Sequence, residues 1–357
     1  MKVLQISSHY DQGGAARIVA TLHRQWLSKD MEAYVAYGRG PCPKDKNIFR
    51  FGTKLEVCIS AMLSRITGRN GYFNHRSTAK LIRKIEQIQP DMIHMHVLHG
   101  YYINVPMLFH YINKNRIPYI WTMHDCHAFT GNCGYFFDCR RWEEGCGNCP
   151  YLNNYPKSLM IDDTARMWRD KQEVYGDSAY GKIVVPSRWL LGEVQKSFLG
   201  KVDCKVIANG IDTDIFCCPK EKGALRAKYG YSAEEKIILG VAVGYQDRRK
   251  GVEYILRLAE ELPDARFILI GWNEKLNYMK KGLNNVITMK TMQDRNKLAD
   301  YYGMADVFVI PSLAENYATT VLESLSCGTP VVGFDIGGIS QQLEDGKGLT
   351  VPLGDMN

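Results

Sequence analysis

The stretch that decides the fold is residues 306–338, which read DVFVIPSLAENYATTVLESLSCGTPVVGFDIGG. Residues 306–310 form a short apolar run rich in β-branched side chains, which is typical of a buried parallel strand. Residues 319–326 are expected to form a helix, because they begin with threonine and are followed by Gly328 and Pro330. Residues 331–334 have the pattern of a second buried strand. Ligands of such a strand–helix–strand unit lie at the carboxyl ends of the strands, beside the start of the helix.

The loop before this helix has the chemistry of a sugar-nucleotide site. Backbone N–H groups near residues 318–320 would face an anion such as a phosphate, and the helix dipole adds positive potential there. Glu315 and Glu323 flank the same helix start, and carboxylates accept hydrogen bonds from sugar hydroxyls. Surface glutamates favoured by the helix dipole would leave the same pattern, so the spacing alone leaves both interpretations open.

A wider pattern resembles a known family. Glu315, seven further residues and Glu323, followed by SCGTPVV and Gly337-Gly338, are similar to the glutamate motif of glycosyltransferase family 4, whose members have the GT-B fold. The resemblance implies that Glu315 approaches the donor sugar and that Glu323 binds the ribose. It also implies that the diphosphate is held by the backbone of the residues between them, Asn316, Tyr317, Ala318, Thr319 and Thr320.

The composition is that of a globular protein. The 357 residues are 45% hydrophobic and 23% charged, and they suffice for two domains. No apolar run reaches the ~20 residues of a membrane span, and residues 1–6 are too short for a signal peptide, so we expect a cytoplasmic protein. The formal net charge of +7 favours anionic partners, but no nucleic-acid-binding motif is recognisable, and we expect no nucleic-acid partner.

A glycine pair, Gly13-Gly14, lies between an expected strand at residues 2–7 and an expected helix at residues 18–28. Paired glycines let the backbone come close to a ligand. The spacing differs from the dinucleotide fingerprint G-x-G-x-x-G, which disfavours a NAD-binding domain. In the resembled family this loop faces the donor diphosphate across the interdomain cleft, although a plain tight turn would give the same letters.

An apolar stripe at helical spacing lies in residues 54–66 and consists of Leu55, Ile59, Met62 and Ile66. Basic residues are scattered around it. A basic amphipathic helix can lie on a membrane surface, so peripheral contact with the inner face of the cell membrane is one interpretation. Packing of the stripe on its own domain is the usual pattern of surface helices, and we favour that interpretation.

His124 ends an expected strand that begins at Pro118, and a histidine at this end of a central strand points into the cleft. In the resembled family a histidine here contacts the donor sugar, which assigns that role to His124. His94 and His96 alternate onto one face of another expected strand and could hold a metal. Because the family has a similar strand without a metal, we interpret them as core or acceptor-cleft histidines.

Four thiols follow within 17 residues, Cys133, Cys139, Cys146 and Cys149. Their spacing suits a tetrahedral Cys₄ zinc site, and iron–sulfur ligation is less expected without a redox task. Unligated thiols are the alternative. A polysaccharide-building subset of the resembled family carries the same cluster, with a tryptophan such as Trp142 ahead of the C-x-x-C pair. A metal here would stiffen a loop beside the acceptor cleft and would not catalyse.

Three adjacent cations, Arg248-Arg249-Lys250, follow an expected strand at residues 236–244. Such a cluster at the carboxyl end of a strand forms an anion site, although solvated surface cations would look the same. The resembled family has an arginine after the strand glycine and then Lys-Gly, and both cations hold the diphosphate. Lys250-Gly251 matches, but Tyr245 replaces the arginine, so the resemblance transfers that role to Arg249.

These features predict an α/β protein with the GT-B fold, in which two Rossmann-like domains with parallel sheets face each other across a cleft. Residues 1–212 are expected to form the acceptor-side domain, with a Cys-rich insertion at residues 126–150. Residues 220–357 are expected to form the nucleotide-sugar domain. The helices that normally end this fold do not follow, so we expect the second domain to be truncated.

The predicted function is that of a retaining, metal-independent glycosyltransferase of the hexosyltransferase type. His124, Lys250 and Glu315 are the candidate catalytic residues, and cations with helix N–H groups would stabilise the leaving nucleotide diphosphate. The resemblance implies a UDP- or GDP-sugar donor and a glycan or lipid-linked acceptor, in the synthesis of capsule, exopolysaccharide or lipopolysaccharide. A nucleotide-sugar-binding protein without transferase activity and a NAD-dependent oxidoreductase are the alternatives.

Overall fold

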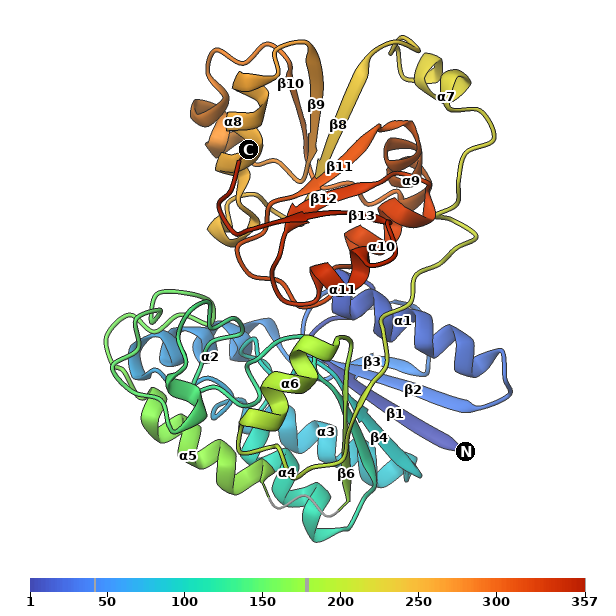
Figure 1. The fold of residues 1–357 in the computed structure, drawn as a ribbon. Helices are drawn as coiled ribbons and strands as arrows, with labels where there is room; N and C mark the ends of the chain where they lie inside the picture. The colour runs from blue at the N-terminus through green and yellow to red at the C-terminus, as the bar shows by residue number, and fades with distance from the viewer. Residues whose placement is uncertain (42, 177–179, 357) are drawn as a thin grey trace. The chain divides into compact units, whose positions relative to one another are not determined.

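The computed structural model describes residues 1–41, 43–176 and 180–356. The chain divides into two compact units, Met1–Ala208 and Asn209–Asn357. Each unit has its own parallel β-sheet and its own hydrophobic core, and Figure 1 shows the elements of both.

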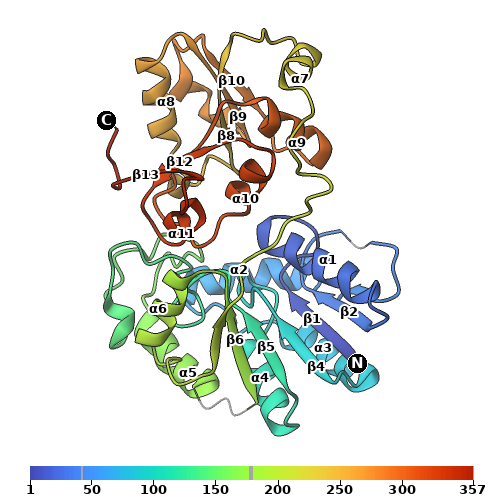
Figure 2. The ribbon, with the colours of Figure 1, turned by 45° about the vertical axis from the view of Figure 1, so that its right-hand side comes forward.

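The sheet of the first unit has seven strands, and all its neighbouring strands pair in parallel. Figure 2 shows β1, β4, β5 and β6 side by side in its middle. In sheet order the strands are β3 (Ile48–Arg50), β2 (Glu32–Tyr37), β1 (Lys2–Ser7), β4 (Met92–Met95), β5 (Tyr119–Thr122), β6 (Gly181–Val185) and β7 (Cys204–Val206).

The helices of the first unit begin where the sequence supplies capping groups. The side chains of Thr53, Asn104 and Ser187 each accept a hydrogen bond from a backbone N–H of the first turn of α2, α4 and α6. The helices are α1 (Gly14–Leu27), α2 (Lys54–Thr67), α3 (His75–Ile88), α4 (Val105–Lys114), α5 (Thr164–Tyr175) and α6 (Arg188–Lys196), with a short 3₁₀ helix, η1 (Arg141–Glu143).

The second unit repeats the plan with a six-stranded parallel sheet. In sheet order its strands are β10 (Val286–Met289), β9 (Ala265–Ile270), β8 (Lys236–Val241), β11 (Val307–Ile310), β12 (Val331–Phe334) and β13 (Gly348–Val351). Its helices are α7 (Lys222–Lys228), α8 (Val252–Glu261), α9 (Arg295–Met304), α10 (Thr319–Ser326) and α11 (Ile339–Leu343), with the 3₁₀ helices η2 (Arg248–Lys250) and η3 (Glu274–Lys280).

Both sheets have a Rossmann-like strand order, which confirms the predicted fold class. In each sheet the first strand of the unit lies in the middle, and the order reverses beside it, between β1 and β4 and between β8 and β11. The predicted strand, helix and strand of residues 306–338 are β11, α10 and β12. Loops at the carboxyl ends of the two strands that flank such a reversal are where ligands of these sheets bind.

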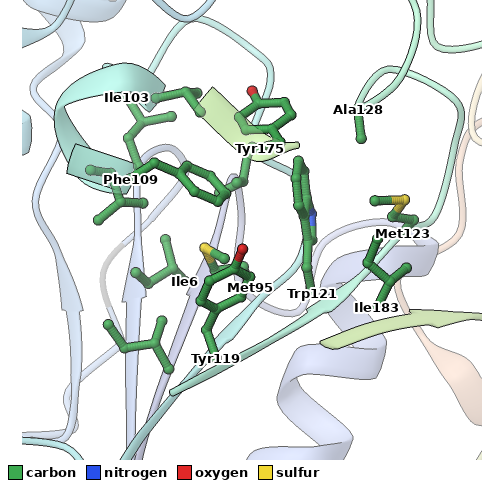
Figure 3. Packing of buried hydrophobic residues seen from close by; sticks show 14 of the residues in the cluster. Ile6, Met95, Ile103, Phe109, Tyr119, Trp121, Met123, Ala128, Tyr175 and Ile183 are labelled. Atoms are coloured by element: carbon green, nitrogen blue, oxygen red, sulfur yellow. The ribbon is translucent and has the colours of Figure 1, made fainter. Parts of the chain in front are cut away.

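The core of the first unit is aromatic (Figure 3). The ring of Trp121 on β5 lies 5.6 Å from that of Phe109 on α4 and 5.1 Å from that of Tyr175 on α5. The indole N–H of Trp121 also donates a 2.8 Å hydrogen bond to the carbonyl of His96. The core therefore fixes the backbone just beyond β4, at His96, one of the predicted histidines.

The core of the second unit joins its central strands to α9 and α10. Tyr302 on α9 packs edge-on against Phe308 on β11 at 5.5 Å, and Val321 on α10 is fully buried beside them. This packing holds the start of α10 against the carboxyl end of β11.

The apolar stripe of helix α2 does not face the direction that we favoured from the sequence. Its apolar stripe faces solvent, with exposed fractions of 72% for Leu55 and 53% for Met62, while the buried residues of the helix are Ser60 and Ser64. The prediction that the stripe packs on its own domain is therefore wrong. The inner side of α2 needs small residues because it lies close to the domain, and that requirement is not visible in an apolar periodicity.

Candidate functional site

The loop after β8 is held tightly against the loop after β11. Gly251 ends this loop with a φ of +60°, and a Cβ there would lie 1.9 Å from the carbonyl oxygen of Pro311. The backbone N–H of Leu313 donates a 2.7 Å hydrogen bond to the carbonyl of Arg249. Only glycine permits this approach, and the approach brings the cations of one loop to the carboxylate of the other.

Lys250, Arg249 and Glu315 form one charged group where the strand order of the second sheet reverses. Lys250 Nζ lies 2.6 Å from Glu315 Oε2, and Arg249 Nη1 lies 3.3 Å from the same oxygen. Arg249 also donates a 2.9 Å hydrogen bond to the carbonyl of Ala314. The sequence predicted these three residues for one site, and the structure brings them together.

The charge state of this group follows from its surroundings. Burial alone would raise the pKa of Glu315, but Lys250 and Arg249 outweigh it and lower this pKa to about 2. The carboxyl group is therefore ionised at neutral pH, and it accepts hydrogen bonds only. An incoming anion would compete with Glu315 for the two cations.

The side chain that replaces the family's arginine lies elsewhere. Tyr245 is 3% exposed and packs in the core, with its ring 6.2 Å from that of Trp272. It cannot offer a donor to a ligand in the loop. Arg249 reaches the carboxylate of Glu315 instead.

The backbone of Glu315 is fixed by the two glycines after β12. Gly337 has a φ of +54°, and a Cβ there would lie 1.8 Å from the carbonyl oxygen of Glu315. The N–H of Gly338 donates a 2.7 Å hydrogen bond to the carbonyl of Asn316. The Gly-Gly pair therefore positions the acid, a function that its place at a strand end did not suggest.

One of the expected free amides is already used. The N–H of Ala318 donates a 3.0 Å hydrogen bond to Gln342 Oε1, and Gln342 Nε2 donates a 2.9 Å hydrogen bond to the carbonyl of Ala318. The interpretation that every amide from residue 316 to 320 faces an anion therefore fails at Ala318. Gln342 lies on α11, 24 positions away, and no local pattern could have identified it. The helix begins directly afterwards, at Thr319.

Glu323 occupies a different environment from Glu315. It is 3% exposed on α10, and its Oε2 accepts a 3.1 Å hydrogen bond from the hydroxyl of Tyr302 on α9. Glu323 lies one turn beyond Thr319, so its carboxylate is held near the first turn of α10 but inside the unit.

The remaining predicted residues belong to the first unit. Gly13 caps α1 with a φ of +89°, and its missing side chain faces open space, because no atom lies within 4 Å of the position that a Cβ would take. Gly14 is the first residue of α1. His124 follows β5, and its Nε2 lies 3.1 Å from His96 Nδ1. Gly13 and His124 thus follow β1 and β5, which flank β4 in the sheet.

A second histidine group went unnoticed in the sequence. His99 Nε2 lies 2.7 Å from Asp125 Oδ2, and Asp125 Oδ1 accepts a 3.0 Å hydrogen bond from the backbone N–H of His127. Burial alone would raise the pKa of Asp125, but His99 and the N–H of His127 lower it overall. The pair spans 26 positions, and only the three-dimensional fold brings it together.

The four predicted metal ligands line a single small pocket, together with Trp142 and Thr164: Cys133, Cys139, Cys146 and Cys149. The backbone N–H of Gly131 donates a 3.1 Å hydrogen bond to Cys146 Sγ. Throughout the described part of the chain, however, no three His, Cys, Asp or Glu side chains are grouped closely enough to hold a metal ion. The thiols are neighbours in the structure without forming a closed coordination site.

Comparison with known proteins agrees with this geometry. A family model described as "Glycosyltransferase Family 4" matches residues 12–215, more than half of the chain, and one described as "Glycosyl transferases group 1" matches residues 221–356. The chain belongs to glycosyltransferase family 4. A relative named for colanic acid biosynthesis, the glycosyl transferase WcaC of Escherichia coli K12, is 24% identical over 365 residues, which cover 98% of this chain and 87% of that protein.

Solved structures share the fold of this family 4 chain. Sucrose-phosphate synthase from Thermosynechococcus elongatus has a TM-score of 0.71 at 17% identity, covering 100% of this chain and 87% of that one. WaaG, described as a glycosyltransferase of lipopolysaccharide biosynthesis, has a TM-score of 0.67 at 15% identity, covering 98% and 86%. Anabaena HepE in complex with UDP-glucose has a TM-score of 0.65 at 17% identity, covering 100% and 86%. These likenesses confirm the predicted GT-B fold.

Within the described residues of this chain, no helix is long and apolar enough to cross a membrane.

Proposed function

We propose that the chain transfers a sugar from a nucleotide-diphosphate sugar to a glycan or lipid-linked acceptor, with retention of the anomeric configuration and without a catalytic metal. The observation that carries this proposal is the convergence of Lys250 and Arg249 on Glu315, beside the reversal of strand order in the second sheet. Lysine and arginine are strong donors to phosphate, and a carboxylate accepts hydrogen bonds from sugar hydroxyls. A diphosphate joined to a sugar combines both requirements.

In the proposed reaction the bond between the sugar C1 and the diphosphate oxygen breaks. The acceptor hydroxyl oxygen forms the new bond to C1 on the same face, and its proton passes to the leaving diphosphate. Lys250 and Arg249 stabilise the negative charge that develops there, with the N–H groups of the first turn of α10. Residues 1–212 take the acceptor side and residues 220–357 the donor side of this proposal.

The other proposed contacts follow the family resemblance. Glu315 approaches the donor sugar, Glu323 the ribose and His124 a donor-sugar hydroxyl. Gly13 and Gly14 leave the backbone open to the diphosphate, and the open space beside Gly13 supports this role. Among the amides of residues 316–320, those of Thr319 and Thr320 lie in the first turn of α10, where intrahelical acceptors are missing.

Polysaccharide assembly is the proposed setting. WcaC is named for colanic acid biosynthesis, and WaaG is described as acting in lipopolysaccharide biosynthesis. HepE was solved with UDP-glucose, which supports a UDP-sugar donor, and a GDP-sugar is the alternative.

The experiment is a thermal-shift panel of UDP- and GDP-sugars, followed by transfer assays with and without EDTA. We expect one sugar nucleotide to raise the melting temperature and to be consumed in both assays. NMR of the product should show the anomeric configuration of the donor. Donor binding without transfer or hydrolysis would contradict the proposal in favour of a binding protein, and loss of transfer in EDTA would contradict metal independence.

A structural zinc ion is the finer proposal for the four thiols. They line one pocket, and a backbone N–H already points at Cys146 Sγ, as it does toward metal-bound thiolates. We propose that the residues around Cys133, Cys139, Cys146 and Cys149 close around Zn²⁺ when it binds, and that the ion stabilises this loop without taking part in transfer.

A further inference from the structure

The exposed face of α2 is apolar. Leu55, Ile59, Met62 and Ile66 have exposed fractions of 72%, 44%, 53% and 39%. They recur at helical spacing, so they lie in one row along the helix. A surface helix normally turns such a row toward its own core, and α2 turns it to solvent.

A second segment extends this row. Leu159, Met160 and Ile161 have exposed fractions of 61%, 72% and 49%. The backbone N–H of Leu159 donates a 2.7 Å hydrogen bond to the carbonyl of Arg65 on α2. A Cβ at Gly68, which caps the same helix, would lie 2.7 Å from the carbonyl oxygen of Ile161. The loop of residues 159–161 therefore lies against the C-terminal end of α2. We call these seven side chains, four along the helix and three on the loop, the α2 apolar face.

The charge around the α2 apolar face is positive. Lys54 and Arg65 on the helix and Lys157 beside the loop are exposed. Of the nearby acids, Glu56 accepts hydrogen bonds from Ser77, Asp162 accepts them from Thr164 and from the backbone N–H of Cys149, and Asp163 pairs with Arg69 at 2.5 Å.

The whole first unit shares this sign. Residues 1–208 carry 28 Lys and Arg against 18 Asp and Glu, whereas residues 209–357 carry 17 against 20. The formal positive charge of the protein thus belongs to the unit that bears the exposed apolar face. Apolar side chains flanked by cations are the combination that binds the interface of an anionic bilayer.

We propose that the α2 apolar face docks the first unit onto an anionic phospholipid surface. The seven apolar side chains enter the boundary between headgroups and acyl chains, and Lys54, Arg65 and Lys157 contact the lipid phosphates. A second copy of the chain fits this face less well, because a symmetric contact would bring the same cations together. The proposal does not depend on the transfer chemistry, and it would place the protein where a lipid-linked acceptor is found.

The test is co-sedimentation with phosphatidylcholine vesicles that contain or lack phosphatidylglycerol. The variant is Ile59→Gln with Met62→Gln, and the matched control is Leu262→Gln, whose side chain is 46% exposed in the second unit. We expect wild type and control to bind only the anionic vesicles, and to be released by salt. The double variant should bind at least about tenfold more weakly, since binding scales with buried apolar area. Unchanged melting temperatures would show that both variants are folded.

Three results would overturn the proposal. Equal vesicle binding by the double variant and wild type would show that this face is not in contact with lipid. Equal binding to vesicles without phosphatidylglycerol would remove the role of the cations. A dimer in sedimentation velocity that the double variant dissociates, without vesicle binding by wild type, would assign the face to a second copy.

An independent observation concerns His124. Gln5 Nε2 donates a 3.1 Å hydrogen bond to the carbonyl of Val19, so Gln5 Oε1 is the atom that faces His96 Nε2, at 3.1 Å. His96 Nδ1 lies 3.1 Å from His124 Nε2. Gln5 and His96 are 0% and 1% exposed. The four groups form a hydrogen-bonded chain from α1 to the end of β5.

The direction of the chain can be worked out from its first member. Gln5 Oε1 can only accept, so His96 carries its proton on Nε2. Burial holds the pKa of His96 well below its usual value, so this ring is neutral and its Nδ1 can only accept. His124 must then donate from Nε2, which leaves His124 Nδ1 without a proton.

We infer that Gln5 is a positioning residue that sets the tautomer of His124 through His96. His124 Nδ1 is thereby an acceptor for a hydroxyl hydrogen, which rests on the proposed contact of His124 with the donor sugar. Gln5 and His96 thus fix the tautomer and the ring orientation of His124, as the hydrogen-bond partner of a catalytic histidine commonly does.

The test reads the tautomer directly, by ¹⁵N NMR of the histidine rings in the full chain, with His124 assigned by substitution. In wild type we expect His96 and His124 both to carry the proton on Nε2. Gln5→Leu should populate both tautomers of His124 and lower kcat with little change in KM. The control Thr122→Val removes the hydroxyl 2.8 Å from His94 Nε2 in the same group and should leave the His124 signals unchanged.

A wild-type His124 with its proton on Nδ1 would overturn this inference, as would an unchanged tautomer in Gln5→Leu. Because the NMR readout does not need a substrate, the inference can fail while the transfer reaction is demonstrated, and the reverse also holds.

Discussion

Lys250 Nζ lies 2.6 Å from Glu315 Oε2, although the two residues are 65 positions apart in the sequence. The contact exists because β8 and β11 are neighbours in the sheet, and the loop after each strand ends at the same edge. In the free protein Lys250 is thus paired with Glu315. Binding of a diphosphate would replace a carboxylate partner with a phosphate partner, and it would leave Glu315 available to a sugar hydroxyl.

Lys250→Ala is the first prediction. Turnover should fall by about 10²–10³-fold, as it does when one preorganised donor to a developing charge is lost. The measurement is kcat with the sugar nucleotide found in the thermal-shift panel. The control is Lys290→Ala, which removes an exposed lysine of the same unit that pairs with Glu274 at 2.8 Å. Wild-type turnover in Lys250→Ala would refute the proposed role.

Glu315→Gln should change how stability depends on pH. The pKa of Glu315 is lowered from 4.5 to about 2, chiefly by Lys250 and Arg249 acting against burial, so its ionised form stabilises the folded state above about pH 4.5. This stabilisation, about 3 kcal/mol at 1.36 kcal/mol per pKa unit, is lost as the pH falls through the folded value.

Thermal unfolding of wild type and Glu315→Gln between neutral pH and about pH 2 measures this gap. The two melting temperatures should differ most at neutral pH and converge toward the acid end. A gap that stays constant over this range would mean that the ion pair does not stabilise the fold.

The sequence predicted the parts of this site that lie on local patterns. The strand, helix and strand of residues 306–338 are β11, α10 and β12, and Lys250 with Glu315 follow the two strands expected to carry them. Parallel strands end at a common edge, so residues just beyond them can be expected to meet without a structure. Strand-end chemistry pointed to these residues, and the family resemblance was needed to distinguish a binding site from solvated surface charges.

The partners that fix the site could not be predicted, because they come from distant elements. Gln342 binds the peptide of Ala318 from 24 positions away, and Gln5 lies 91 positions from His96. The apolar stripe of α2 was visible, but its direction depends on what fills the space beneath the helix, here Ser60 and Ser64. A period of 3.6 residues gives a face of a helix but not its orientation.

Gly337→Ala should damage the site more than its conformation alone would suggest. Gly337 has a φ of +54°, and its Cβ would lie 1.8 Å from the carbonyl oxygen of Glu315. The matched control is Gly346→Ala, at a φ of +74° with no atom within 4 Å of the Cβ. The control should cost about 1 kcal/mol of left-handed strain. Gly337→Ala should cost about 3 kcal/mol or more, because the clash adds to that strain.

Denaturant unfolding measures the loss of stability in Gly337→Ala and Gly346→Ala, and titration with UDP or GDP measures their nucleotide binding. Gly337→Ala should lose nucleotide binding, since the backbone of Glu315 must move, whereas Gly346→Ala should keep it. Equal destabilisation of the two variants would show that the close approach at Gly337 relaxes without cost.

The zinc proposal predicts about one zinc ion per chain after reducing purification. Cys146→Ser with Cys149→Ser should abolish it, while Cys217→Ser with Cys218→Ser, a neighbouring exposed pair in the second unit, should not. Burial raises the pKa of Cys133 to about 12 and that of Cys146 to about 11. Zinc binding must therefore release protons, and the affinity should rise with pH. A chain without zinc under these conditions would leave the thiols unligated.

The last prediction concerns Gln342→Met. This variant tests whether the Ala318 peptide holds the loop through Gln342 or donates its N–H to a phosphate. Gln342 is 4% exposed. Its side-chain amide accepts a hydrogen bond from the N–H of Ala318 and donates one to the carbonyl of Ala318. The thioether cannot replace them, so a buried N–H and C=O lose their partners, at a cost of about 1–3 kcal/mol each. The loop that carries Glu315 should then loosen, so nucleotide binding should weaken and the melting temperature should fall. The control Gln293→Met alters an exposed glutamine of the same unit and should change neither quantity. If Gln342→Met instead strengthened nucleotide binding, the Ala318 N–H would be a phosphate donor that Gln342 occupies only in the free protein, and the original expectation for residues 316–320 would be restored.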